Sequence, residues 1–113
     1  MKSKLLALSK NEDFRILLKS KKTSNKYATI FFGRLHSKNK NNLNISFVTK
    51  KKIGNAVMRN KIKRRLRNIM NDACKKTSIN FDYSYLVIAK STMLNNDFKK
   101  IKETLFLEFK KMR

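Results

Sequence analysis

The part of this sequence best suited to chemistry is a basic segment, residues 50–68, which reads KKKIGNAVMRNKIKRRLRN. A basic run is most often a solvated helix face, but such faces usually carry acids that pair with Lys or Arg four residues away. No Asp or Glu occurs between Lys50 and Asn71, so the like charges repel one another without relief. Lys and Arg side chains neutralise phosphates, and Arg can do so with two hydrogen bonds at once. We therefore expect this segment to bind a phosphate-rich partner.

A second feature is a group of aromatic residues in the first half of the chain, namely Phe14, Tyr27, Phe31, Phe32 and Phe47. Aromatic side chains on a sheet beside basic groups can stack unpaired bases, at about 1–3 kcal/mol per base. The alternative is that these rings belong to the hydrophobic core. Phe14 and Phe32 are the two that we expect to remain partly exposed.

Side chains suited to catalysis are scarce. The 7 acids include one adjacent pair, Glu12 and Asp13, which a helix would point about 100° apart. No two acids have a metal-ligand spacing, His36 lies in a polar stretch with no orienting carboxylate, and Cys74 is the only thiol. A protein nuclease needs a carboxylate cluster or a His pair. We therefore expect no catalytic or metal site in the protein itself.

The composition points to the same kind of partner. The chain of 113 residues has 29 Lys and Arg against 7 Asp and Glu, a net charge of +22. This length predicts one domain, residues 1–113, with a modest core. A charge of this size favours a polyanionic partner, and nucleic acid is the default. An acidic membrane surface is the alternative, but it usually binds a detached polybasic tail or an amphipathic anchor, whereas here the basic residues run through the whole chain.

The location of the protein is predicted from what the sequence lacks. No apolar run approaches the roughly 20 residues of a membrane span, and the apolar stretch at residues 5–8 is too short for a signal peptide. A single Cys excludes a disulfide framework and a multi-thiolate zinc site. These observations predict a cytoplasmic protein that does not associate with membranes.

Three amphipathic segments are predicted to be helices. Residues 9–19 include Ser9 and Glu12, which have the spacing of a capping box. Residues 57–75 place apolar side chains on about a third of the helix circumference and basic side chains on the rest. A third helix follows Asn95 or Asn96, either of which could cap it. The apolar stripe of the middle helix consists of Met58, Ile62, Leu66, Ile69, Met70 and Ala73.

Three segments rich in β-formers are predicted to be strands, over residues 27–35, 43–49 and 83–89. The polar residues 36–42 most simply join the first two strands in an antiparallel hairpin. The third strand, YSYLVIA, is continuously apolar, which favours a central position in the sheet. Residues 20–26 are expected to be a loop or a short edge strand.

The predicted order of elements is α-β-β-(β)-α-β-α, where the bracket marks the optional short strand. This is an α+β fold in which helices pack on one sheet as a two-layer α/β sandwich. The middle helix connects two strands, and if these strands are parallel the general rule predicts a right-handed crossover.

The basic segment also resembles the signature of a known family. The string KKIGNAVMRNKIKRRLRN is similar to the motif of the bacterial ribonuclease P protein component, in which a Lys-rich turn, a Gly and Ala-Val-x-Arg-Asn-Arg open a basic helix. Here the triplet is Arg59-Asn60-Lys61, which keeps the charge of the third residue but loses its two-pronged hydrogen bonding. Residues 8–14, 43–48 and 85–90 resemble the family's first helix and the strands on either side of the signature.

The resemblance implies a left-handed βαβ crossover, as in the second domain of ribosomal protein S5, and this overrules the general expectation. It implies a subunit of a ribonucleoprotein that removes the 5′ leader from precursor tRNA. The RNA subunit would carry the chemistry with magnesium, which is held mainly by that RNA and the substrate. The protein would be a monomer when free, would bind ribonuclease P RNA and the leader, and would strengthen substrate and magnesium binding.

The resemblance also implies two sets of site residues. Those that resemble the family's RNA-subunit-binding residues are Lys51, Lys52, Arg59, Asn60, Lys61, Lys63, Arg64 and Arg67. In the family, aromatic residues of the first helix and a neighbouring strand line a cleft for the single-stranded leader. The strand aromatic falls near Ile30, and Leu18 stands where the family has a second helical aromatic. The resulting leader-binding set is Phe14, Leu18, Tyr27, Ile30 and Phe32.

Two other hypotheses remain open at this point. A structural RNA-binding protein, such as a small ribosomal protein, fits the composition equally well, and only the signature separates the two. A protein-only nuclease is disfavoured by the missing catalytic cluster.

Overall fold

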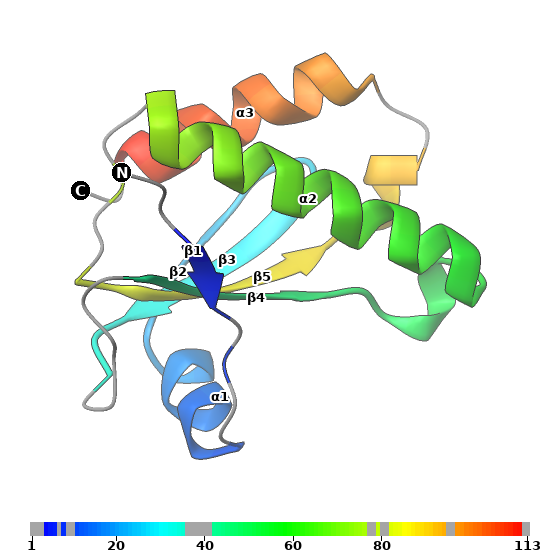
Figure 1. Cartoon of the computed structure of the whole chain (residues 1–113). Helices are drawn as coiled ribbons and strands as arrows, with labels where there is room; N and C mark the ends of the chain where they lie inside the picture. Colours follow the sequence, from blue (N-terminus) through cyan, green and yellow to red (C-terminus); the bar gives the residue numbers. More distant parts are fainter. Residues whose placement is uncertain are drawn as a thin grey trace.

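The computed structural model describes residues 4–6, 8, 11–35, 42–76, 79, 82–94 and 97–111. These residues form one mixed sheet with three α-helices and two short 3₁₀ helices (Figure 1). In chain order the elements are β1 (Lys4–Leu6), α1 (Asn11–Leu18), β2 (Lys21–Ser24), β3 (Ala28–Gly33), β4 (Asn42–Val48), η1 (Lys51–Ile53), α2 (Ala56–Lys76), β5 (Ser84–Ala89), η2 (Ser91–Leu94) and α3 (Phe98–Lys111). The predicted α+β class is confirmed, and β2 is the optional short strand.

The five described strands lie in the order β1-β4-β5-β3-β2. β1, β4 and β5 are parallel neighbours, whereas β3 runs antiparallel to β5 and β2 runs antiparallel to β3. β5 is therefore central, as its continuous apolar sequence predicts. Its residues Tyr85, Leu86 and Val87 are almost fully buried.

The predicted hairpin between residues 27–35 and 43–49 is wrong. β3 and β4 run in opposite directions but do not pair, because β5 lies between them and bonds to both. The intervening polar stretch needs to span only two strand spacings, about 10 Å in all, to allow this. A hairpin and a connection across one strand therefore look alike in the sequence.

Helices cover both faces of the sheet (Figure 1). α2 and α3 lie over one face and enclose the main core, in which Tyr85 and Phe109 are the largest fully buried side chains. α1 covers part of the opposite face and adds a short third layer to the predicted two-layer arrangement. The smaller cluster beneath α1 consists of Leu8, Leu17, Leu35 and Leu86.

The connection from β4 through α2 to β5 is left-handed. In the view of Figure 1, β1 is nearest the viewer, β4 and β5 run from left to right with β5 behind β4, and α2 returns above them. This is the hand that the family resemblance implies, and the general right-handed rule does not hold here.

Two details of the helices differ from the predictions. Met58 is 38% exposed, because the first turn of α2 lies beyond the ends of the strands (Figure 1). α3 is capped by Asp97, whose Oδ1 accepts a hydrogen bond from Lys99 N at 3.3 Å and whose carbonyl oxygen accepts one from Ile101 N at 3.1 Å.

The other predicted members of the α2 stripe are buried, namely Ile62, Leu66, Ile69, Met70 and Ala73. Ser9, His36, Asn95 and Asn96 lie outside the described residues.

Candidate nucleic-acid interface

The basic side of α2 is fixed by a cap at its first turn. Asn55 Oδ1 accepts a hydrogen bond from Met58 N at 2.9 Å, and the Asn55 carbonyl oxygen accepts one from Arg59 N at 3.0 Å. η1 directly precedes this cap, so Lys51 and Lys52 lie beside the start of the helix. The helix then buries its apolar stripe against the sheet and turns its other side outward.

All eight residues of the predicted RNA-subunit set lie between the start of η1 and Arg67 of α2. Arg59 is half-buried, and its Nε is buried with no hydrogen-bond partner among the described residues. The other seven side chains are exposed, namely Lys51, Lys52, Asn60, Lys61, Lys63, Arg64 and Arg67. Seven of the eight side chains are therefore exposed along η1 and the adjoining turns of α2. We call the eight residues the α2 surface.

The acidic residue of α2, Asp72, lies toward the C-terminal end of the helix and contacts α3. Asp72 Oδ2 lies 2.6 Å from the Lys102 Nζ of α3. This hydrogen bond is the main cause that lowers the pKa of Asp72, so its charge serves the contact between α2 and α3. The cations of the α2 surface have no comparable acid between residues 50 and 71 to neutralise them.

A second surface lies where α1 packs on the sheet. Phe14 and Leu18 are one turn apart on α1; Phe14 is half-buried and Leu18 is 51% exposed. Phe31 of β3 is half-buried on the same side and belongs to the cluster beneath α1. Lys22 stands opposite Phe31 in the sheet register, with its ammonium 5.9 Å from the ring centroid. We call these four residues the α1 surface; it combines rings, an apolar side chain and a cation, as sites for single-stranded nucleic acid do.

A glycine allows the end of α1 to lie close to β3. A Cβ on Gly33 would be 2.8 Å from the Oγ of Ser20, which follows α1. Ser20 Oγ in turn donates a hydrogen bond of 2.7 Å to the carbonyl oxygen of Ile16. A larger residue at position 33 would have to displace the side chain of Ser20, so glycine permits this close approach of β3 and the end of α1.

Three members of the predicted leader-binding set lie on the other face of the sheet or within the core. Ile30 is 0% exposed and Tyr27 is 4% exposed, both in the core beneath α2 and α3, so neither side chain offers surface to a ligand. Phe32 is half-buried but packs against that same core. Because side chains alternate along a strand, Phe31 is the aromatic of β3 that faces α1. A one-residue ambiguity in aligning β3 exchanges the two faces of the strand, so we take Phe31 in place of Tyr27, Ile30 and Phe32 in the leader-binding set proposed below.

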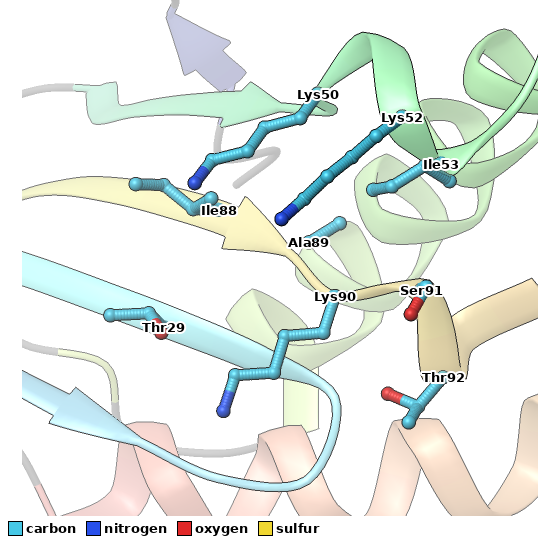
Figure 2. Close-up of a pocket in the computed structure, with 9 residues that line it drawn as sticks. All are labelled: Thr29, Lys50, Lys52, Ile53, Ile88, Ala89, Lys90, Ser91 and Thr92. Carbon is cyan, nitrogen blue, oxygen red and sulfur yellow. The ribbon is translucent and has the colours of Figure 1, made fainter.

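A pocket of about 500 Å³ lies beside η1, where β5 ends (Figure 2). Lys50, Lys52 and Lys90 line it, and we call it the lysine pocket. Figure 2 shows Lys50 and Lys52 reaching toward β5 near Ile88 and Ala89, while Lys90 extends away from these two lysines. Lys90 Nζ donates hydrogen bonds to Ser24 Oγ at 2.8 Å and to the carbonyl oxygen of Asn25 at 2.6 Å. The pocket offers several cations to one ligand, which suits a phosphate chain.

Four residues at these surfaces are absent from the two predicted site sets, namely Lys22, Phe31, Lys50 and Lys90. Lys50 opens the run of three lysines, so the signal for it was present. Phe31 was in the predicted aromatic group, but the sequence did not show on which face of the sheet its side chain lies. Lys22 belongs to a pair with Lys21 and Lys90 stands alone, so neither is conspicuous in this Lys-rich chain. The pairing of β2, β3 and β5 brings them to these surfaces.

The described residues include no group of three or more His, Cys, Asp or Glu that could hold a metal ion. Cys74 is half-buried, and burial raises the pKa of its thiol, which disfavours the reactive thiolate. No helix in the described part of the chain is long and apolar enough to cross a membrane. The cations and rings of the surfaces described above are suited to binding phosphates and bases.

Comparison with known proteins decides the family. The ribonuclease P family model matches residues 2–113. The chain belongs to the ribonuclease P protein family. The ribonuclease P protein component of Listeria monocytogenes serotype 4b is 33% identical over 99 residues, covering 87% of this chain and 80% of that protein. The ribonuclease P protein component of Bacillus pumilus is 34% identical over 105 residues, covering 92% and 85% of the two chains.

Solved structures of ribonuclease P proteins share this fold. The protein from Thermotoga maritima has a TM-score of 0.80 and 24% identity, covering 96% of this chain and 98% of that one. A protein from Staphylococcus aureus has a TM-score of 0.76 and 25% identity, covering 94% and 93%. The left-handed connection and the positions of the helices therefore belong to a fold that ribonuclease P proteins have in common.

Membership of this family confirms the function predicted from the signature. Ribonuclease P is an RNA-based endoribonuclease, and its protein component acts with ribonuclease P RNA in the removal of the 5′ leader from precursor tRNA. Its partners are that RNA and the tRNA substrate, and the chemistry is carried by the RNA. The family match favours this function over the structural ribosomal protein and the protein-only nuclease.

Proposed function

We propose that the protein assists leader removal through two connected surfaces. The α2 surface binds ribonuclease P RNA, whose phosphates its exposed Lys and Arg side chains neutralise. The α1 surface binds the single-stranded leader, with unpaired bases stacked on Phe14 and Phe31 and contacting Leu18.

The observation that carries this proposal is the continuity of the two surfaces through the lysine pocket. Thr29 and Phe31 are two residues apart on β3, so both side chains face the α1 side of the sheet. Thr29 lines the lysine pocket, and so does Lys52 of η1, which leads into α2. A leader stacked on Phe31 would thus meet the pocket lysines before it reaches the RNA subunit on α2.

In this proposal the metal chemistry stays with the RNA. Magnesium would be held mainly by the RNA subunit and the substrate, since the described residues offer no carboxylate cluster for it. The cations of the α2 surface and the lysine pocket reduce the repulsion between the two RNA molecules, which strengthens substrate and magnesium binding. We further propose that the free protein is a monomer and that it acts in the cytoplasm.

Reconstitution tests the proposal. A 5′-extended precursor tRNA would be incubated at low magnesium with the protein alone, with a bacterial ribonuclease P RNA alone, and with both. We expect mature 5′ ends only in the mixture, at a magnesium concentration where the RNA alone is nearly inactive. Tight but indiscriminate RNA binding without rescue of cleavage would contradict it.

A further inference from the structure

A second aromatic and basic surface lies at the opposite end of the sheet from the lysine pocket. Gly33 of β3 pairs with Ser84 of β5, so the residues on either side of this pair are neighbours across the two strands. The guanidinium carbon of Arg34 lies 5.7 Å from the centroid of the Tyr83 ring. The Phe32 ring meets the Tyr83 ring edge-on, with centroids 5.4 Å apart and an interplanar angle of 67°. We call Phe32, Arg34 and Tyr83 the Arg34 platform.

The platform is anchored in the main core by further ring contacts. Tyr83 meets Tyr85 edge-on at 6.4 Å, and Tyr85 meets Phe109 of α3 edge-on at 5.2 Å. Tyr85 and Phe109 are fully buried, Tyr83 and Phe32 are half-buried, and Arg34 is exposed. A series of rings therefore leads from the core to a planar cation at the surface. Because that cation already rests on a ring, a third planar group can stack on it with little further loss of side-chain freedom.

We propose that the Arg34 platform stacks an unpaired nucleotide of ribonuclease P RNA. Unpaired RNA bases stack on guanidinium planes as well as on aromatic rings. Lys21 of β2 stands opposite Phe32 in the sheet register and is exposed, so it can neutralise the adjoining phosphate. The inference rests on the proposed function for the identity of the RNA partner.

The side of the sheet on which the platform lies favours the RNA subunit over the leader. Phe32 packs on the core beneath α2 and α3, whereas Phe14 and Phe31 lie in the cluster on the α1 side. The platform therefore shares its side of the sheet with the α2 surface. Asp82 precedes Tyr83 and is exposed, which reduces the net charge of this patch. We therefore expect stacking on Arg34 to contribute to the binding together with charge.

The test compares two substitutions of one residue in the full chain. Arg34→Ala removes the planar cation, and Arg34→Lys keeps the charge but removes the plane. We expect both to weaken binding to ribonuclease P RNA by similar factors, about fivefold or more, as expected for a stacked base. Lys99→Ala, which removes one exposed charge from α3, is the control and should change the affinity by less than about twofold.

Two outcomes would overturn the inference. If Arg34→Lys binds the RNA as tightly as the wild type, the residue acts as a simple charge. If both Arg34 variants bind the RNA normally but lose affinity for precursor tRNA, the platform serves the leader instead. Rescue of cleavage by the wild-type protein, measured separately, shows whether the proposed function itself has failed. Thermal unfolding of each variant confirms that it is folded.

Discussion

The Lys90 ammonium donates a hydrogen bond of 2.6 Å to the backbone oxygen of Asn25, which joins the end of β5 to the turn between β2 and β3. The same turn is held from the other side by Glu108 of α3. The Glu108 carboxylate accepts hydrogen bonds from Asn25 Nδ2 at 3.2 Å and from Thr23 Oγ1 at 3.0 Å. The position of a pocket lysine is thus connected to an acidic residue that does not line the pocket.

The first prediction concerns this connection. We expect Glu108→Ala to lower the free energy of unfolding by about 1–3 kcal/mol, because the half-buried donors of Thr23 and Asn25 lose their acceptor. Chemical denaturation measures the change. Glu103→Ala on the exposed side of the same helix is the control and should stay within about 0.5 kcal/mol of the wild type. Equal effects of the two substitutions would show that the Glu108 hydrogen bonds do not stabilise the fold.

The second prediction concerns the charge of Lys90. Lys90→Met keeps most of the side-chain length but removes the ammonium group. We expect weaker binding of leader RNA and a salt-dependence slope smaller by about 0.7, the value for one phosphate of a single strand that is no longer neutralised. Ser24→Ala removes a hydrogen-bond partner of Lys90 and keeps the charge, so its slope should match the wild type. If Lys90→Met leaves the slope unchanged, Lys90 does not bind phosphate.

The third prediction compares basic residues in the middle of α2 with basic residues in its last turn. The double variant Arg64→Ala, Arg67→Ala should bind ribonuclease P RNA more weakly. Its salt-dependence slope should fall by roughly 0.7–0.9 for each phosphate that the missing guanidinium groups no longer neutralise. The matched control is Lys75→Ala, Lys76→Ala, which removes two exposed charges from the last turn of the same helix. The prediction fails if both double variants reduce the slope equally, since the effect would then be one of total charge.

The sequence predicted best those elements whose patterns are local. The length of α2 follows from a 3.6-residue periodicity that continues over many turns, and the five buried members of its stripe dock as expected. The central position of β5 follows from its continuous apolar residues, because only a strand covered on both faces can bury them all. The α2 surface was predictable for the same reason: once the stripe faces the sheet, the basic residues must face outward.

The features that the sequence did not predict depend on the packing of distant segments. Nothing in residues 27–49 shows that β5, which comes much later in the chain, is inserted between β3 and β4. The choice between Ile30 and Phe31 for the α1 side depends on a register of one residue, and apolar residues on both faces of β3 hide that register. The ammonium of Lys90 is held by Ser24 of β2 and by Asn25 of the following turn, and no pattern near Lys90 indicates these partners.

The fourth prediction uses two adjacent phenylalanines on opposite faces of β3. Phe31 lies on the α1 surface, and Phe32 belongs to the Arg34 platform; both are half-buried. We expect Phe31→Ala to reduce the preference for precursor over mature tRNA by roughly 5- to 150-fold, which corresponds to one stacked base at about 1–3 kcal/mol. Phe14→Ala should act in the same direction, because Phe14 lies on the same surface.

Phe32→Ala is the matched control for this prediction, since it removes the same ring from the neighbouring position of the same strand. It should weaken binding to ribonuclease P RNA through the Arg34 platform and leave the ratio of precursor to mature tRNA affinity unchanged. Both variants lose buried ring area, so each ratio is compared at a temperature where thermal unfolding shows the variant to be folded. If Phe32→Ala lowers the ratio and Phe31→Ala does not, the leader binds on the side of α2 and α3, and the assignment of the two faces must be reversed.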